Sequence, residues 1–143
     1  MAILPRVILK RGREKPVLRG HPWVFSGAVA KIEGEVSPGE VGEVYSKGSQ
    51  FLGLGHINPR SQIVVRLLTQ KKEELRENFF RERILRAMGL REDWLKGKTN
   101  AYRVINGEGD YLPGLIVDRY RETLVLQCLT AGMDRLKGMF TNL

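Results

Sequence analysis

Short apolar runs separated by turn residues fill the first 69 residues of this chain. The runs cover residues 7–9, 28–32, 41–45, 50–57 and 63–68, and pairs such as Pro38-Gly39 and Asn58-Pro59 lie between them. Runs this short cannot form ordinary helices, and their close spacing is typical of strands joined by tight turns. The pattern predicts a small closed or half-closed β-barrel.

The hydrophobic period changes after Thr69. Residues 71–88 contain no proline or glycine, and Phe80, Ile84 and Met88 repeat every four residues. This spacing predicts an amphipathic helix over 71–88, with Gly89 as its left-handed cap and a polar loop over 91–100. Strands over 101–105, 115–117 and 123–129 and a last helix from residue 131 follow. We therefore predict an α+β protein with two domains, residues 1–69 and 70–143.

The last helix follows a strand and is followed by no further strand. A strand-helix unit of this kind is half of a larger α/β arrangement. We expect the second domain to be incomplete and the chain to be truncated before a further domain. A frayed terminus explains the same pattern equally well.

Positive charge limits the partners that the chain can bind. The net charge is +8, the sequence pI is about 9.9, and fifteen of the 24 basic residues are arginine. Between residues 6 and 19 a single acid, Glu14, lies among six basic residues: Arg6, Lys10, Arg11, Arg13, Lys15 and Arg19. Fixed positive charge of this density attracts a phosphate backbone, and arginine also stacks on bases. These features favour nucleic-acid binding over a generally basic surface.

Two segments of the first domain carry candidate RNA-binding residues. In residues 19–25, Arg19 and His21 are the better ligand candidates. Trp23 and Phe25 suit stacking on bases, but we predict them in the barrel core. The glycines of residues 53–60 indicate either a tight barrel corner or a close approach by another backbone, which could be RNA with Arg60 on a phosphate.

The acidic segment 106–110 is a second kind of candidate. Its glycines fail the dinucleotide fingerprint, because Pro113 and a strand follow instead of a helix. Glu108 and Asp110 could perform general acid-base chemistry. Alternatively, Asp110 and Asp118 bond the turn backbone and pair with Arg103 or Arg119. We assign no catalytic residue and no metal site.

The single cysteine, Cys128, excludes an internal disulfide. Strand alternation predicts it buried beside Leu124 and Leu126, as a structural residue. No apolar stretch approaches the roughly 20 residues of a membrane span, so we expect a cytoplasmic protein without a membrane partner.

Three stretches together resemble a known family. The order RGHPWVFSGAV and then GEVGEVYSKGSQFLGLGHINPRSQIVVRLLT resembles a PUA domain, a small RNA-binding pseudo-barrel. Followed by a helix and by NGEGDYLPGLIVDRY, it is similar to the start of the RlmI-like 23S ribosomal RNA cytosine-C5 methyltransferase family. The resemblance covers essentially the whole chain.

This resemblance implies a PUA domain and a central α/β domain that precede a Rossmann-like domain binding S-adenosylmethionine. It implies methyl transfer to C5 of a cytosine in ribosomal RNA, in which a cysteine thiolate attacks C6 and a base removes the C5 proton. The cysteine and the cofactor loop belong to the later domain. We therefore expect no cofactor in this chain and no catalytic role for Cys128.

The resulting hypothesis is the RNA-recognition region of such a methyltransferase, with ribosomal RNA as partner and a homodimer formed through an uncovered strand edge. The expected RNA-binding residues are Arg11, Arg13, Lys15, Arg19, His21 and Arg60. Arg103, Glu108 and Asp110 would border the catalytic domain. The alternatives are a stand-alone PUA-type RNA-binding or adapter protein and a free-standing acid-base enzyme centred on Glu108 and Asp110.

Overall fold

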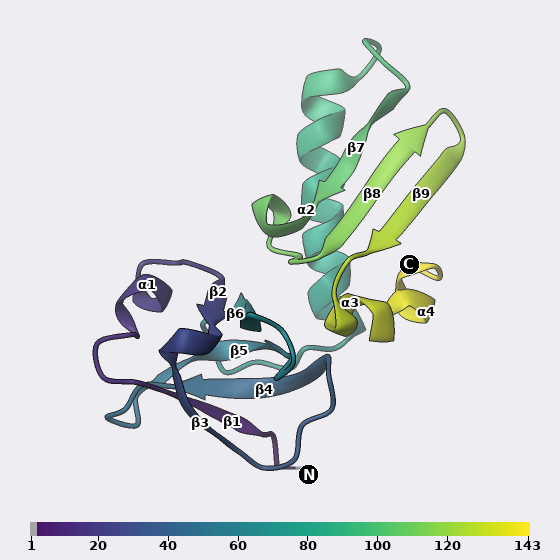
Figure 1. Cartoon of the computed structure of the whole chain (residues 1–143). Coiled ribbons are helices and arrows are strands. Elements are labelled where there is room, and N and C mark those ends of the chain that lie inside the picture. Colours follow the sequence, from purple (N-terminus) through teal and green to yellow (C-terminus); the bar gives the residue numbers. More distant parts are fainter. Residues whose placement is uncertain (1–2) are drawn as a thin grey trace. The chain divides into compact units, whose positions relative to one another are not determined.

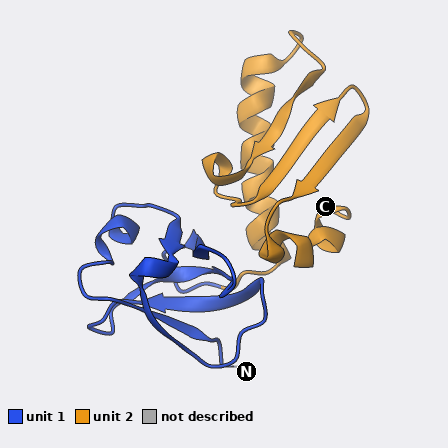
Figure 2. Cartoon of the chain, viewed as in Figure 1, with its two compact units in different colours: residues 1–73 blue, residues 74–143 orange. Residues whose placement is uncertain are grey.

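Two compact units make up the chain, residues 1–73 and residues 74–143 (Figure 2). The computed structural model describes residues 3–143. Each unit has its own sheet, and helices accompany both sheets. The predicted α+β class is confirmed.

The first unit is a curled six-stranded sheet in the order β2-β6-β5-β4-β1-β3 (Figure 1). Its strands are β1 (Arg6–Leu9), β2 (Trp23–Phe25), β3 (Val29–Glu33), β4 (Glu40–Tyr45), β5 (Phe51–Ile57) and β6 (Ile63–Thr69), with a short helix α1 (Lys15–Leu18) and a 3-10 turn η1 (Ser26–Ala28). Strand β1 pairs with β3 in the antiparallel sense and with β4 in the parallel sense. The first strand therefore lies inside the sheet, between two strands that come later in the sequence.

The core of this unit follows from strand alternation. Val7 and Leu9 of β1 are fully buried, whereas Arg6 of the same strand is exposed. The other buried core side chains come from α1 and from the remaining strands except β3: Val17, Val24, Val44, Leu52, Ile57, Val64, Val65 and Leu67. Strand β1 buries alternate residues, whereas β6 buries the adjacent residues Val64 and Val65, so the curled sheet covers both faces of β6.

Gly53 and Gly55 lie where the backbones of β5 and β6 come closest. A Cβ atom at Gly55 would lie 2.3 Å from the carbonyl oxygen of Arg66, and one at Gly53 would lie 2.5 Å from that of Thr69. The register also shifts between Leu54 and Gly55. The neighbouring backbone that requires these glycines is therefore strand β6.

The second unit is a three-stranded antiparallel sheet, β7-β8-β9, with helix α2 packed mainly against β7 (Figure 1). Its elements are α2 (Glu77–Leu95), β7 (Ala101–Asn106), the 3-10 turn η2 (Gly107–Asp110), β8 (Leu115–Tyr120), β9 (Thr123–Cys128), α3 (Ala131–Arg135) and α4 (Lys137–Phe140). Phe80, Leu112, Leu115 and Met133 are its largest fully buried side chains. Strand β9 is an edge strand of this sheet.

The predicted bounds of the long helix were wrong at both ends. Helix α2 begins at Glu77 and continues through Gly89 to Leu95, so Gly89 does not cap it. At the start, the Thr69 hydroxyl accepts the Lys71 amide N–H at 3.1 Å and donates to the Glu73 carboxylate. These local bonds hold the segment after β6 outside the helix.

Charged residues are spread along the whole of α2, from Glu77 to Asp93. Neither this helix nor any other in the described residues has the length and apolar character needed to cross a membrane.

Candidate functional site

The predicted RNA-binding residues of the first unit are all exposed. Arg11 and Arg13 lie in the turns after β1, Lys15 and Arg19 lie at the two ends of α1, and His21 lies just before β2. Val17 anchors α1 in the core, and its carbonyl oxygen accepts a hydrogen bond from the Gln70 side chain. Within residues 3–143, no carboxylate forms an ion pair with Arg11, Arg13, Lys15 or Arg19. The buried Val17 side chain therefore holds α1 in place, and the cations around this helix are exposed to solvent.

Arg60 lies in a different place, in the turn between β5 and β6. Its side chain is exposed, and its backbone N–H donates to Oδ1 of Asn58 at 3.1 Å. The other predicted cations lie around α1, between β1 and β2. The structure therefore does not join Arg60 to that group.

Three aromatic rings form a surface cluster beside these cations. The centroids of His21 and Trp23 are 5.9 Å apart, those of Trp23 and Phe25 are 6.2 Å apart, and those of His21 and Phe25 are 6.4 Å apart. The backbone N–H of Trp23 donates to Nδ1 of His21 at 3.2 Å, which fixes the imidazole against β2. Exposed rings of this kind are suited to stacking on unpaired bases.

The prediction that Trp23 and Phe25 fill the barrel core was wrong. Strand β2 turns Val24 inward, where it is 2% exposed, and leaves Phe25 48% exposed and Trp23 half-buried. Side-chain size suggested the core, but the two-residue period of a strand decides which side faces it. Arg66 of β6 pairs in register with Trp23 and therefore lies on the same outer face.

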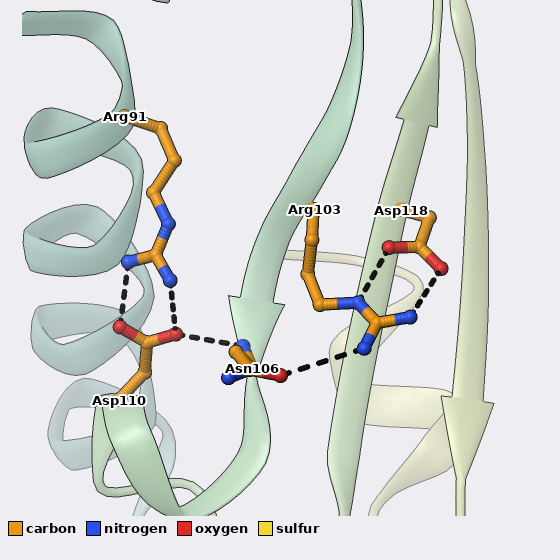
Figure 3. Close-up of polar contacts among 5 residues, drawn as sticks. All are labelled: Arg91, Arg103, Asn106, Asp110 and Asp118. Carbon is orange, nitrogen blue, oxygen red and sulfur yellow. Dashed lines mark hydrogen bonds and ion pairs between the residues drawn. The ribbon is translucent and has the colours of Figure 1, made fainter. Parts of the chain in front are cut away.

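A buried ion pair fixes the acidic turn of the second unit (Figure 3). The side chain of Asp110 is only 6% exposed, and its two oxygens accept N–H groups of Arg91 at 2.6 and 2.7 Å. The backbone N–H of Asn106 donates to the same carboxylate at 2.6 Å. A bidentate pair with a third donor leaves Asp110 poorly placed to accept a proton from a substrate.

Arg103 belongs to a second ion pair, on the neighbouring strands (Figure 3). Its guanidinium donates to both oxygens of Asp118, at 2.8 and 3.2 Å, and lies 3.5 Å from Oδ1 of Asn106. The pairing of Asp118 with Arg103 was predicted, whereas Asp110 pairs with Arg91 and not with Arg103 or Arg119. Glu108 lies in the same 3-10 turn as Asp110 and is half-buried.

The guanidinium of Arg103 lowers the pKa of Asp118, and Asp118 raises the pKa of Arg103, mainly through their hydrogen bonds. A lowered carboxyl pKa stabilises the fold at pH values above the ordinary pKa of an aspartate. The stabilisation is lost as the pH falls through the lowered value. Because the Arg103 side chain is half exposed, water competes for its hydrogen bonds and the pair contributes little to stability.

Arg91 is the residue of this network that the sequence interpretation missed. The sequence predicts a loop at Arg91, because Gly89 is expected to end the helix. A helix continued through Gly89 puts Phe80, Ile84, Ala87 and Arg91 on one face, and Phe80 and Ala87 are buried. An arginine at that spacing predicts a buried acidic partner.

Cys128 is half-buried at the end of β9, so the prediction of a buried thiol was only partly correct. Burial raises the pKa of the thiol, and the charge of Asp134 raises it further. A raised pKa lowers the thiolate fraction at neutral pH and does not suit a nucleophile. The described residues contain no cluster of three or more metal-ligating side chains.

A groove of about 590 Å³ opens within the second unit. Its lining is mostly apolar and includes Ile84 and Met88 of α2, Val117 of β8, Leu126 of β9 and Phe140 of α4. Leu124 and Val125 of β9 are exposed as well. The sheet around β9 therefore carries apolar surface that the described residues leave uncovered.

Comparison with known families defines the class of the first unit. Residues 7–70 match the family model of the PUA-like domain. This match covers the whole curled sheet from the second residue of β1 to the end of β6. The first unit is therefore a PUA-like domain, as its sequence resemblance implied.

The chain as a whole is similar to part of several longer proteins. It is 45% identical over 133 residues to ribosomal RNA large subunit methyltransferase I of Salmonella arizonae, and 46% identical over 132 residues to the protein of the same name from Erwinia tasmaniensis. These matches cover 91% and 90% of this chain and 33% of each relative. The chain is homologous to the N-terminal part of these methyltransferases, which confirms the family resemblance.

Solved structures show the same fold. A protein of Streptococcus mutans described as a SAM-dependent methyltransferase superimposes with a TM-score of 0.82 at 21% identity, over 99% of this chain and 36% of that one. A methyltransferase crystallised with SAH gives the same values. The chain spans about a third of the length of the relatives that it matches.

Proposed function

We propose that this chain is the RNA-recognition region of an S-adenosylmethionine-dependent ribosomal RNA cytosine-C5 methyltransferase. The observation that carries the proposal is the 45% identity over 91% of the chain to a ribosomal RNA large subunit methyltransferase. Ribosomal RNA is the substrate in the name of that relative, and such a protein would work in the cytoplasm. S-Adenosylmethionine binding and methyl transfer would belong to the two thirds of these relatives that the chain does not span.

The PUA-like unit would hold the RNA. Phosphates would bind Arg11, Arg13, Lys15 and Arg19, which are exposed and not neutralised by described carboxylates. Unpaired bases would stack on the exposed cluster of His21, Trp23 and Phe25. Cations beside aromatic rings are the combination that single-stranded RNA requires. Arg60 would contribute a separate phosphate contact.

In the second unit we propose that residues near η2 border the methyltransferase part of the complete protein. Glu108, half-buried in η2, would belong to this border. Arg103 and Asp110 would shape it, because each is already bound by a neighbouring side chain. The apolar groove beside β9 is compatible with burial against a further domain.

Replacement of Phe25 by alanine tests the RNA assignment. Because the ring lies on the surface, the variant should fold as the wild type does. Stacking of one base contributes about 1–3 kcal/mol, so we expect roughly 5- to 150-fold weaker binding of a short single-stranded RNA. Fluorescence anisotropy with labelled RNA measures this effect.

Ile3→Ala is the matched control, because Ile3 is a strongly exposed apolar residue of the same unit outside the aromatic cluster. It should bind RNA with wild-type affinity. A Phe25→Ala variant that binds as tightly as the Ile3→Ala variant would show that bases do not stack on this cluster.

We also propose that a second copy of the chain pairs along the free edge of β9. The strand TLVLQC carries no charge, proline or glycine, the features that usually block edge pairing. Light scattering should show a dimer for the wild type and a monomer for Val125→Lys. Leu85→Lys, with the same charge on exposed α2, should remain a dimer. A wild-type chain that is monomeric at all concentrations would remove the homodimer.

A further inference from the structure

Tyr111 has a backbone conformation that few tyrosines adopt. It follows η2 with φ 59° and ψ 28°, in the left-handed region, and its side chain is 60% exposed. A bulky residue in this region is an outlier that the surrounding structure must hold in place. Since the ring fills no part of the core, the packing of the fold does not account for a tyrosine at this turn.

Contacts on both sides of Tyr111 hold its backbone. Its carbonyl oxygen accepts a hydrogen bond from the guanidinium of Arg83, and its N–H donates to the carbonyl oxygen of Glu108 at 3.1 Å. The preceding residue, Asp110, is fixed by the bidentate pair with Arg91. The turn is therefore attached to α2 at two successive residues, and the tyrosine ring projects from a rigid support.

Two arginines of α2 lie beside the Tyr111 ring. The guanidinium carbons of Arg83 and Arg86 each lie 5.9 Å from the centroid of the Tyr111 ring, and that of Arg83 lies 4.0 Å from the centroid of Phe79. Phe79, Arg83 and Arg86 share one helix face, because they are spaced four and three residues apart. We call these four residues the Tyr111 patch: Phe79, Arg83, Arg86 and Tyr111.

The Tyr111 patch offers free positive charge as well as an aromatic surface. Arg86 is exposed, and among the described residues it forms no ion pair. Arg81, on the same helix, is instead paired with Glu77 at 2.8 Å. A guanidinium beside a ring keeps its N–H groups for a phosphate, while the exposed ring stacks on a base.

We propose that the Tyr111 patch is a second contact for single-stranded RNA, located on the second unit. The inference rests on the proposed function, since it requires a chain that binds RNA. It adds a site outside the PUA-like domain, where phosphate binds Arg86 and one unpaired base stacks on Tyr111. RNA is favoured over an acidic peptide because a peptide carboxylate would use the arginines and leave the exposed ring without a partner.

Tyr111→Gly separates recognition from folding. Glycine adopts the left-handed conformation without strain, so the thermal midpoint of the variant should equal or exceed that of the wild type. Removal of the ring should weaken binding of a labelled single-stranded RNA by at least about fivefold. Arg86→Gln should weaken it by about fivefold near 0.1 M salt and lower the slope of log K against log salt by about 0.7.

Arg81→Gln is the matched control, since it removes the same charge from the same helix outside the patch. It should keep the wild-type salt dependence. The patch assignment is overturned if Tyr111→Gly and Arg86→Gln bind RNA as the wild type does, or if Arg81→Gln loses as much affinity as Arg86→Gln. It is also overturned if Tyr111→Gly loses only the binding of an oligoglutamate peptide.

The Phe25→Ala variant distinguishes this failure from failure of the proposed function. If Phe25→Ala weakens RNA binding while Tyr111→Gly does not, the first unit binds RNA and the Tyr111 patch does not. If the wild-type chain binds no RNA at low salt, both proposals fail together.

Discussion

Simultaneous replacement of Arg11, Arg13 and Arg19 by alanine is expected to weaken binding of single-stranded RNA by roughly 100-fold near 0.1 M salt. Each phosphate contact on a single strand contributes about 0.7 to the slope of log K against log salt, so three contacts contribute about 2. The three side chains are exposed, and none is needed by the core. Anisotropy titrations over a range of salt concentrations measure both the affinity and the slope.

A triple replacement of Lys96, Lys98 and Lys137 by alanine is the control for net charge. These exposed lysines belong to the second unit and lie outside the Tyr111 patch. The control should lower the salt slope much less than the arginine variant. If both triple variants change the slope equally, the chain binds RNA only through its overall charge of +8.

Asp110→Ala is expected to give the largest loss of stability in the second unit, about 3 kcal/mol in the free energy of unfolding. The change leaves the guanidinium of Arg91 and the N–H of Asn106 without their shared acceptor. Both groups lose a charge-assisted hydrogen bond in a site with little access to water. Chemical denaturation gives the free energy, and hydrogen exchange at the Asn106 amide reports the lost bond directly.

Asp118→Ala removes a carboxylate with a similar bidentate geometry and serves as the comparison. Its partner Arg103 is half exposed, so water replaces the lost bonds and the stability should change little. If the two substitutions lower the free energy of unfolding equally, the difference in burial does not decide how much each ion pair contributes to stability. Asp110→Asn should lie between Asp110→Ala and the wild type, because it keeps an acceptor for Asn106.

The strands could be predicted from the sequence because their signals are local. The five apolar runs predicted in the first unit end within one residue of the observed strands β1, β3, β4, β5 and β6, since turn residues mark their ends. The segment 23–25 was misinterpreted because two large aromatic side chains suggested a core position. Its alternation, with Val24 between Trp23 and Phe25, already contained the correct orientation.

The long helix and the acidic site depended on tertiary contacts. One glycine inside a helix costs about 1 kcal/mol relative to alanine, and the burial of Phe80 and Ala87 together with the Arg91–Asp110 pair offsets that cost. Arg91 and Asp110 are 19 residues apart, so neither a turn motif nor a helix period relates them. The contact of the exposed Tyr111 ring with two arginines could likewise not be predicted from the sequence, because these side chains meet only when α2 and η2 have folded.

The interior position of β1 has a consequence for how the first unit is made. Both sheet neighbours of β1 are translated later than it: β3 begins at Val29 and β4 ends at Tyr45. During synthesis, β1 has no sheet partner until β3 has left the ribosome, and β3 ends at Glu33, 24 residues after Leu9. The six-stranded sheet is complete only after β6, which ends at Thr69, has emerged, so the surface proposed to bind RNA requires synthesis of the whole domain.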